Sequence, residues 1–459
     1  MPHIPTATYT INMNLIRKTI REALATPGFT MLYIIGVSFT VMFTMVYAII
    51  LYSQLCPVYP EYDRPSTIYL AGINISNDEL AMNGGFSQSF IDQYLRGKLK
   101  SVSDITAINT YNPDYPMVQT NGNGPEFHVE MRNVEPSFFS FYDYEFLAGK
   151  PFSQSDFDSR LHVAAISDKV AQRLFTSPED AIGKDIKINN VRYRISGVFR
   201  EGSALCIDSY GEVFVPYTLS NSLSNFFNEY PIMQNSGTLE VMVKVKPGKE
   251  KLLRNELEEI CRRINAIDST SPKLRIPFIE THTEHVFSSY EDYDSEPGQT
   301  AIAESKGILA LWRPLLTGLL VVLVIPALNI SGLIGSRMDK MASEIGIRRS
   351  FGATRSSLMR MVMTENMVLT VAGGIIGLAL SWIIMACAGD ILLKFTPLAY
   401  HSGSSAGSSA AFITGEIAFA PVVFIITIVV CLLLNTLSAW IPTRRAMRRQ
   451  ITESINSKR

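Results

Sequence analysis

Four stretches of the chain are long, apolar and free of charged side chains. They cover residues 29–55, 314–336, 367–389 and 417–441. A helix of about 20 residues crosses the roughly 30 Å hydrocarbon core of a bilayer, and each stretch is at least that long. The pattern therefore predicts four membrane-spanning helices.

The first stretch is also a candidate signal peptide. Its apolar run of 27 residues exceeds the roughly 7–15 residues of a signal core, and no small-x-small cleavage site follows. We interpret it as an anchor. In the preceding residues 1–28, the segment 14–25 (NLIRKTIREALA) has the pattern of an amphipathic helix lying on the inner membrane surface, with its cationic side chains near lipid phosphates.

The first half of residues 56–313 alternates between strand and helix patterns. Strand-like residues 66–73 precede a helical pattern over 87–99, and strand-like residues 103–111 follow. Runs of β-branched and aromatic residues flanking an amphipathic helix are typical of a βαβ unit. We expect one such unit here.

A second unit of this kind is predicted near the end of the same region. Residues 239–245 alternate as a strand, 249–264 place apolar side chains on one helical face, and 273–278 are again strand-like. Between the two units, residues 118–234 are rich in short strand patterns, which indicates an inserted lobe. The predicted fold class is thus a membrane protein with four transmembrane α-helices and a large mixed α/β extracytoplasmic domain between spans 1 and 2.

Charge sorts by region, although the formal net charge of the whole chain is only −1. Residues 1–28, 337–366 and 442–459 together hold 15 basic and 5 acidic residues, whereas the rest holds 26 basic and 37 acidic. Because Lys and Arg are retained on the cytoplasmic side of membranes, these three segments are predicted inside and residues 56–313 and 390–416 outside. The hydrophobic fraction of 47% together with the low charged fraction of 18% excludes a disordered or fibrous chain.

Short motifs in the inserted lobe resemble a known family. They are VEPSFF at 134–139, LAGKPF at 147–152, AISDKVAQRLF at 165–175, IGK at 182–184 and ISGVF at 195–199. Two further motifs, EIGIRRSFGAT at 344–354 and IPTRRA at 441–446, lie in the segments predicted to be cytoplasmic. In order and spacing the chain resembles FtsX-like and MacB-type ABC transporter permeases.

The resemblance implies a mechanism and partners. Such permeases work as dimers in the bacterial inner membrane, with a second identical or paralogous permease and ABC-type ATPase subunits. They transmit ATP-driven motion to the extracytoplasmic domain, a process called mechanotransmission, in some cases with a periplasmic adaptor and an outer-membrane channel. Membrane lipids are further expected partners, and nucleic acid is not.

The cytoplasmic segment 338–354 is short and amphipathic on its own evidence. A helix of this kind either lies on the lipid surface or docks in the groove of a partner. The resemblance implies the second use, as a coupling helix in which Glu344, Arg348 and Arg349 make polar contacts and Ile345 and Ile347 fill the groove. The implied coupling residues are Glu344, Ile345, Gly346, Ile347, Arg348, Arg349, Phe351 and Gly352.

The chain contains no G-x-x-x-x-G-K-[ST] loop to bind a triphosphate. We therefore expect it not to be an enzyme and to bind no cofactor, with ATP and Mg²⁺ bound by a separate ATPase subunit. This departs from the MacB exporter, whose nucleotide-binding domain is fused before the first span.

Small residues in two spans indicate close helix packing. Gly373 and Gly377 form a GxxxG pattern, and Ser331 and Gly335 repeat the small-xxx-small spacing. Packing within one chain and contact between two copies are both consistent with this pattern. The absence of charged residues inside the spans argues against a proton relay through the bilayer.

Other candidate sites are weaker. His282 and His285 lie three residues apart, as two metal ligands on a helix would, but a solvated helix start is favoured. The acidic residues 291–296 lack the spacing of a calcium loop. Cys206 and Cys261 are both on the predicted outer side, where a disulfide is possible.

Three function classes remain open. They are export of a hydrophobic or peptide-like substrate, release of lipoproteins, and regulation of a cell-wall hydrolase without transport. The large external domain favours export, because division-type members of the resembling family have a much smaller one.

Overall fold

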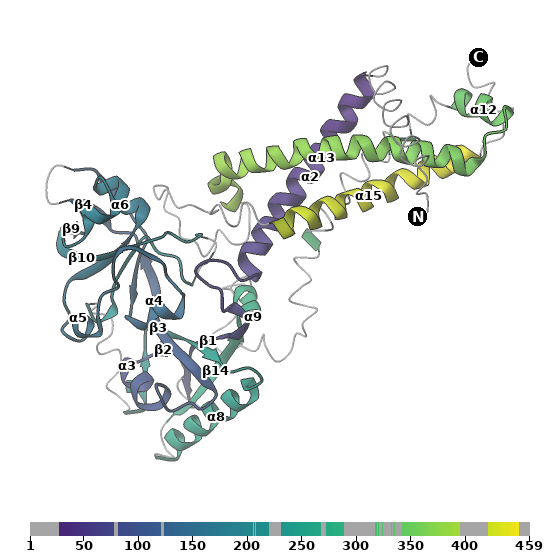
Figure 1. The fold of residues 1–459 in the computed structure, drawn as a ribbon. Coiled ribbons are helices and arrows are strands. Elements are labelled where there is room, and N and C mark those ends of the chain that lie inside the picture. The colour runs from purple at the N-terminus through teal and green to yellow at the C-terminus, as the bar shows by residue number, and fades with distance from the viewer. Residues whose placement is uncertain are drawn as a thin grey trace, which may run out of the picture. The chain divides into compact units, whose positions relative to one another are not determined.

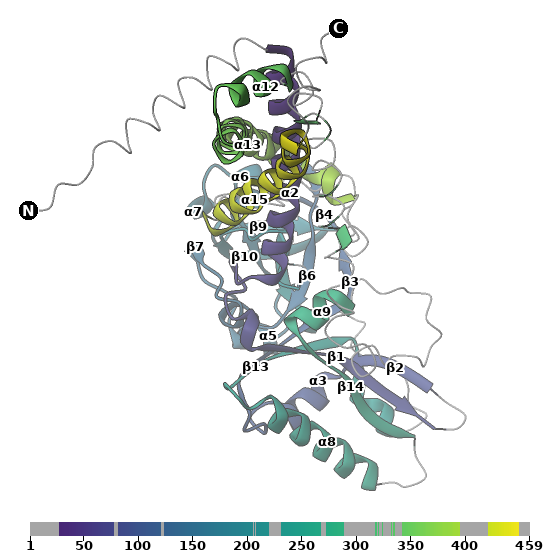
Figure 2. The ribbon, with the colours of Figure 1, turned by 90° about the vertical axis from the view of Figure 1, so that its right-hand side faces the viewer.

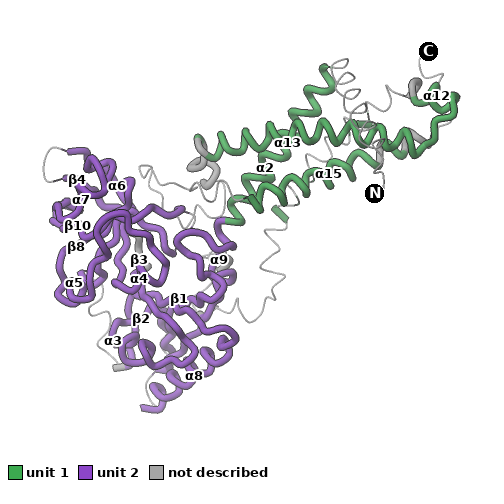
Figure 3. Tube along the Cα trace, in the orientation of Figure 1, with its two compact units in different colours: residues 1–52, 312–389, 415–459 green, residues 53–311, 390–414 purple. Residues whose placement is uncertain are grey.

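The structure, a computed structural model, divides into two compact units (Figure 3). Unit 1 comprises residues 1–52, 312–389 and 415–459, and unit 2 comprises 53–311 and 390–414. The described residues are 27–77, 81–120, 124–204, 206, 208–219, 231–267, 272–288, 317, 318, 320, 324, 332, 334, 335, 342–394 and 421–448.

Unit 1 is helical (Figure 1). Its described helices are α2 (Pro27–Leu55), α12 (Ala342–Ser350), α13 (Arg355–Lys394) and α15 (Pro421–Arg448). The last residues of α2 and of α13 belong to unit 2. The helices α2, α13 and α15 are each long and apolar enough to cross a membrane. Most of the expected second span, residues 314–336, lies outside the described residues, so the structure contains three of the four expected spans.

The start of α13 differs from the prediction. The helix begins at Arg355 rather than at residue 367 and therefore includes Glu365, whose side chain is 2% exposed. Thr354 accepts a hydrogen bond from the Ser357 backbone N–H, which caps the helix at this earlier point. The expected span 367–389 itself contains no charged residue; Glu365 lies in the part of the helix that precedes it.

The two predicted βαβ units are present and interlock within one sheet of unit 2. Four strands lie in the order β14 (Lys273–Thr281), β1 (Thr67–Ser76), β13 (Leu239–Val245) and β3 (Val102–Asp114). Because β1 is antiparallel to both β13 and β14, and β3 is antiparallel to β13, each βαβ unit places its two parallel strands around a strand of the other. This is the split-βαβ arrangement of ferredoxin-like folds.

The two crossover segments differ in length. The first contains α3 (Gln88–Phe90) and a π-helical turn (Ile91–Leu95), and the second is α8 (Glu250–Ile267). Phe90 and Leu257, one from each, belong to the same hydrophobic cluster as the strands. Figure 2 shows α8 running beside β14.

The predicted insert is a strand-rich lobe whose strands continue the same sheet beyond β3. It contains parallel pairs, β8 with β10 and β6 with β11, as well as antiparallel ones. The remaining strands of unit 2 are β2 (Ala81–Phe86), β4 (Met117–Thr120), β5 (Glu126–His128), β6 (Met131–Val134), β7 (Phe146–Gly149), β8 (Val163–Ser167), β9 (Asp185–Ile188), β10 (Val191–Phe199), β11 (Val213–Pro216) and β12 (Ser236–Gly237). Its remaining helices are α4 (Ser137–Phe141), α5 (Gln154–Asp158), α6 (Asp168–Leu174), α7 (Pro178–Ala181), α9 (His282–Ser288) and three 3₁₀ turns (Arg64–Ser66, Tyr217–Leu219, Pro231–Asn235).

Two glycines explain part of the motif spacing in the lobe. Gly149 has a φ of +66°, and a Cβ there would lie 2.4 Å from the Ser196 carbonyl oxygen. A Cβ on Gly197 would lie 2.6 Å from the Lys150 carbonyl oxygen. The motifs LAGKPF and ISGVF therefore need glycine where β7 and β10 meet, because the two backbones approach too closely for a side chain.

Candidate functional site

The predicted coupling segment forms α12 and the turn that follows it. The Ala353 N–H donates to the Arg348 carbonyl and the Gly352 N–H donates to the Arg349 carbonyl. Gly352 has a φ of +89°. These two hydrogen bonds and the left-handed glycine form a Schellman motif, which ends a helix while satisfying its last carbonyl groups. Gly352 is thus required by the backbone of the turn.

Phe351 lies at the tip of this turn and is 89% exposed. Thr354 then caps α13, so the chain reverses between two helices within a few residues. A fully exposed phenylalanine on a tightly capped turn has little freedom of backbone conformation and a large apolar surface to offer. The motif RRSFGAT therefore builds a rigid, apolar projection.

The two isoleucines of α12 have different surroundings. Ile345 is 3% exposed and packs in a hydrophobic cluster of unit 1 with Val37, Leu358 and Val362. Ile347 is 52% exposed. The expectation that both fill a partner's groove is therefore revised, because Ile345 is already used to hold α12 on its own helices.

The polar residues of the segment are less uniform than the motif suggests. Arg348 directs a guanidinium nitrogen to the Met361 sulfur at 3.0 Å and is partly buried. Gly346 is buried and Arg349 is partly exposed. Glu344 lies on α12, and its side chain falls outside the described part of the chain.

The GxxxG pattern of α13 faces α2 within unit 1. A Cβ on Gly377 would lie 2.5 Å from the Ser38 carbonyl oxygen, and one on Gly373 would lie 2.9 Å from the Val37 side chain. The Ser38 hydroxyl is within hydrogen-bond distance of the Gly373 carbonyl at 2.9 Å. Of the two uses weighed for this pattern, the structure contains the intramolecular one. In the second pattern, Gly335 is helical and Ser331 lies outside the described residues.

Hydroxyl groups add to the contacts of these helices. Thr370 on α13 lies 3.1 Å from the Tyr33 hydroxyl of α2 and accepts from the Asn435 amide of α15 at 3.5 Å. One threonine thus contacts all three described long helices. Such short polar contacts hold membrane helices together where apolar surface cannot, because lipid is as apolar as the side chains.

A buried arginine holds the outer end of α2 to the sheet domain, within unit 2. The Arg64 guanidinium donates to the carbonyl oxygens of Ser53 and Cys56, to the Glu61 carboxylate at 2.6 Å and to the Cys206 sulfur at 3.3 Å. Arg64 and Glu61 are each 3% exposed. A cation at a helix C-terminus binds the carbonyl groups that have no partner inside the helix. The last turn of α2 is therefore anchored to the sheet domain by charge.

Cys206 and Cys261, the pair for which a disulfide was considered, are free thiols. Cys206 lies in the arginine site, where burial raises the pKa of its thiol to about 12. Cys261 lies on α8 facing β14, and burial raises the pKa of its thiol to about 11. Both thiols stay protonated at neutral pH and are poor nucleophiles.

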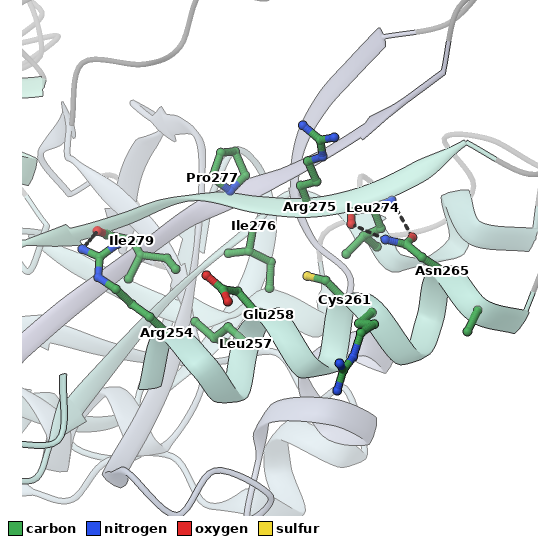
Figure 4. A pocket seen from close by; sticks show the side chains of 12 residues that line it. Arg254, Leu257, Glu258, Cys261, Asn265, Leu274, Arg275, Ile276, Pro277 and Ile279 are labelled. Atoms are coloured by element: carbon green, nitrogen blue, oxygen red, sulfur yellow. Dashed lines mark hydrogen bonds between the residues drawn. The ribbon is translucent and has the colours of Figure 1, made fainter. Parts of the chain in front are cut away.

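The outer edge of β14 is covered by α8 (Figure 4). The Asn265 side chain both donates to and accepts from the Leu274 backbone, and Arg254 donates to the Ile279 carbonyl. An open groove of about 640 Å³ remains between helix and strand. Because these backbone groups already have partners, the edge is protected against pairing with another strand.

Two parts of the chain match known families. Residues 30–260, half of the chain, match the MacB-like periplasmic core domain, and residues 316–451 match the FtsX-like permease C-terminal domain. The chain belongs to the MacB/FtsX-like permeases. The resemblance carried by the short motifs is thereby confirmed, including the mixed α/β periplasmic domain that this family of ABC transporter permeases contains.

The curated relatives of this permease are longer than the chain. The pyoverdine export ATP-binding/permease protein PvdT of Pseudomonas syringae pv. syringae is 26% identical over 307 residues, which are 64% of this chain and 42% of that protein. The macrolide export ATP-binding/permease protein MacB of Escherichia coli K12 is 20% identical over 327 residues, 71% of this chain and 43% of that protein. The chain thus spans less than half of either relative.

Among solved structures, the permease is similar to the periplasmic region of MacB from Actinobacillus actinomycetemcomitans, with a TM-score of 0.33 and 14% identity over 50% of this chain and 94% of that one. It is also similar to the extracellular domain of the ABC-type transporter YknZ, with a TM-score of 0.32 and 18% identity over 46% of this chain and 98% of that one.

His282 and His285 do start a helix in the permease, α9, but neither imidazole is solvated. Their burial corrects the expected solvated helix start: His282 is 5% exposed and the His285 side chain 14%. Among the described residues no group of three or more His, Cys, Asp or Glu has the arrangement of a metal site. The acidic residues 291–296 lie outside the described part of the chain.

Sequence reasoning missed the arginine site entirely. Its members, Glu61, Arg64 and Cys206, are separated by up to 145 positions and follow no motif spacing. The available signal was a short charged group, Glu61, Asp63 and Arg64, directly after a span. A charged pair at such a place is costly to keep unless it is used.

Proposed function

We propose that this permease couples ATP hydrolysis by an ABC-type ATPase to motion of its periplasmic domain, and so exports a hydrophobic or peptide-like substrate. The observation that carries the proposal is the exposed apolar projection formed by Ile347 and Phe351 on the capped turn after α12. An apolar helix end of this kind fits a groove in a partner protein. ATP and Mg²⁺ would be bound by the ATPase.

The orientation of the chain in the membrane follows from the charge distribution. The segment 337–366 is basic and residues 56–313 are acidic, which supports a cytoplasmic α12 and a periplasmic sheet domain in the inner membrane, with both termini inside. The printed names of the relatives describe export of pyoverdine and of macrolides, which supports export over lipoprotein release or hydrolase regulation.

Transmission would run through α2 and its anchored end. Closure of the ATPase moves α12, which packs through Ile345 on the helices of unit 1. α2 continues from that unit to the Arg64 site, where its last carbonyl groups are bound. A second permease copy completes the dimer, and an adaptor and outer-membrane channel would receive the substrate.

The test compares two isoleucines with the same substitution. Ile347→Asp, alone and with Phe351→Asp, is purified with its ATPase in detergent, and copurification and ATP hydrolysis are measured. Both variants are expected to lose the ATPase and its stimulation at least tenfold, since a buried carboxylate in an apolar groove costs more than 1.4 kcal/mol, about tenfold in binding.

The matched control is Ile267→Asp at the end of α8, where the isoleucine is 80% exposed. It introduces the same charge on the periplasmic domain and is expected to leave copurification unchanged. If Ile347→Asp and Phe351→Asp retain full ATPase stimulation, α12 is not the docking element and the proposed function loses its support.

A further inference from the structure

His285 is surrounded by three carboxylates from three different segments of unit 2. Its Nε2 lies 3.2 Å from Asp208 and 3.6 Å from Glu240 on β13, and its Nδ1 lies 3.0 Å from Glu280 on β14. Its ring stacks on Tyr69 of β1 with centroids 4.2 Å apart. The three carboxylate side chains are each no more than 15% exposed.

One imidazolium has two N–H groups and cannot donate a hydrogen bond to each of three carboxylates. The Glu280 and Asp208 carboxylates lie at hydrogen-bond distance from the two ring nitrogens. Glu240 is 7% exposed, and its Oε1 has no hydrogen-bond partner in the described part of the chain. This oxygen has only the 3.6 Å ion-pair contact with His285. A buried carboxylate that lacks a hydrogen bond is costly when ionised, and the cost falls when it takes up a proton.

Besides His285, Arg132 acts on Glu240 and lowers its pKa, but Arg132 is itself ion-paired with Glu130 at 3.0 Å. Other titratable groups face the cluster from β1, from β6, from the end of α4, from α9 and from the segment after α2. They are Tyr69, Arg132, Tyr142, His282, Glu61 and Arg64.

The pKa shifts agree with this geometry. Burial raises the pKa of Glu240 to about 7; His285 opposes the shift, while Asp208 and Glu280 add to it. Against the effect of burial, the three carboxylates raise the pKa of His285 well above its usual range. Burial also opposes the shift of Asp208, but His285 lowers its pKa to about 2. Near neutral pH, Glu240 is therefore the member that exchanges a proton.

The same short helix contacts the end of α2. The His282 Nε2 lies 2.7 Å from the Gln54 carbonyl oxygen, and its Nδ1 lies 3.0 Å from the Tyr69 hydroxyl. Tyr69 thus contacts both histidines of α9. In sequence, α9 is the last described element of unit 2 before the expected second span. One short helix therefore contacts the end of α2 and, in sequence, precedes the expected second span.

We propose that α9 is a proton-linked latch, closed on β1 and on the end of α2 when Glu240 holds a proton and loosened by repulsion between Glu240 and Asp208 when the proton leaves. Its effect on transmission rests on the proposed function. The latch itself depends only on the fold of unit 2.

Hydrogen–deuterium exchange of the full chain in detergent, without ATPase or nucleotide, tests the latch. After correction for the intrinsic chemical rate, amides of α9 are expected to exchange about tenfold faster at pH of about 8 than at about 6, as linkage to one group of pKa about 7 requires. Glu240→Gln should keep α9 closed and reduce this difference, leaving only the part due to the raised pKa of His285. The control Glu126→Gln, at an exposed carboxylate on β5, should keep it.

The wild-type chain provides a second readout if the variant folds poorly. The pH dependence of α9 should exceed that of α8 in the same molecule, because opening of the latch is local. An equal dependence in both helices overturns the proposal, and so does an unchanged tenfold difference in Glu240→Gln. An effect of added Ca²⁺ or of EDTA as large as that of pH also overturns it, because the site would then bind a cation. None of these outcomes bears on ATPase docking, so failure of the latch and failure of the proposed function are distinguishable.

Discussion

The two units of the permease bury polar groups in opposite ways. Unit 2 encloses full charges in pairs and clusters, such as Arg64 with Glu61 and Arg132 with Glu130. Apart from Glu365, the buried polar side chains described in the long helices of unit 1 are uncharged, and glycines let the helices approach. The apolar side chains also differ, since α2, α13 and α15 expose many of them while those of unit 2 are mostly inside.

The difference follows from the two solvents. In water, burial of apolar surface supplies enough free energy for the sheet domain to tolerate buried ion pairs. Between lipid-exposed helices no such driving force exists, so close backbone contact and short hydroxyl bonds provide the attraction. The helix α2 passes from unit 1 into unit 2. Its first part has close backbone and hydroxyl contacts with other helices, and its last turn is bound by the buried charge of Arg64.

The largest expected effect tests the buried charge of unit 2. Arg64→Met leaves the Glu61 carboxylate buried without its cation and should lower the free energy of unfolding by about 3–5 kcal/mol. Arg262→Met is the matched control, because Arg262 and Glu259 also form a pair three residues apart but the arginine side chain is 77% exposed. It should cost no more than about 1 kcal/mol. Denaturant unfolding of the full chain measures both, and equal losses would contradict the assigned role of Arg64.

A second prediction concerns pH. Burial raises the pKa of Glu212 to about 7, so its protonated form stabilises the fold fully below pH of about 4.5, and this contribution is lost as pH rises through about 7. Unfolding of unit 2 should therefore occur at lower temperature at pH 8 than at pH 6, and this group should contribute about 1.4 kcal/mol to the difference.

Glu212→Gln keeps the acceptor for the Glu130 backbone N–H. It should make the unfolding temperature less dependent on pH, leaving the part of that dependence due to Glu240 and His285. Scanning calorimetry at several pH values measures it. A slope as steep as that of the wild type would show that Glu212 does not titrate in this range.

The third prediction tests helix contact in unit 1. Gly377→Ala forces a Cβ against the Ser38 carbonyl and should destabilise the helices by about 1–3 kcal/mol. Gly374→Ala, three positions earlier, meets no atom within 4 Å and should be neutral or stabilising. Thermal stability in detergent distinguishes them. If both variants are equally stable, α13 does not contact α2 in this way.

The smallest effect is expected at Asn366, which is 4% exposed and whose amide atoms have no hydrogen-bond partner among the described residues. Asn366→Leu replaces a buried polar side chain by an apolar one of similar volume. It should lower the free energy of unfolding by less than about 1 kcal/mol, or raise it. Asn435→Leu, which removes the contact with Thr370, should be the more harmful of the two. The reverse order would mean that Asn366 has a partner in the membrane.

Much of the fold could be predicted because its signals are local. The apolar lengths predicted three described membrane helices, and period-two and helical patterns predicted β1, β3, β13, β14 and α8 within a few residues. β2 was missed, because its sequence AMNGGF is rich in glycine and lacks the β-branched residues of a typical strand. The early start of α13 was missed because capping at Thr354, rather than hydropathy, decides where that helix begins.

The candidate site was predicted only in part, because only some of its features depend on residues close in sequence. The motif ending in Phe351 and Gly352 is local, so the turn was found from sequence. The sequence did not show that Ile347 faces outward and Ile345 inward. α12 is short, and its orientation depends on the helices it packs against.

By itself the sequence determined the family, the apolar helices long enough to cross a membrane, the two βαβ units and the position of the turn at Phe351 and Gly352, since each depends on residues that are neighbours along the chain. The interlocking of the two βαβ units in one sheet was decided by the tertiary structure. Only the tertiary structure decided that Arg64 binds the end of α2, that His285 lies among Asp208, Glu240 and Glu280, and that Ile345 is buried. These contacts join distant segments, and their energies arise from desolvation, which depends on what surrounds a group in space.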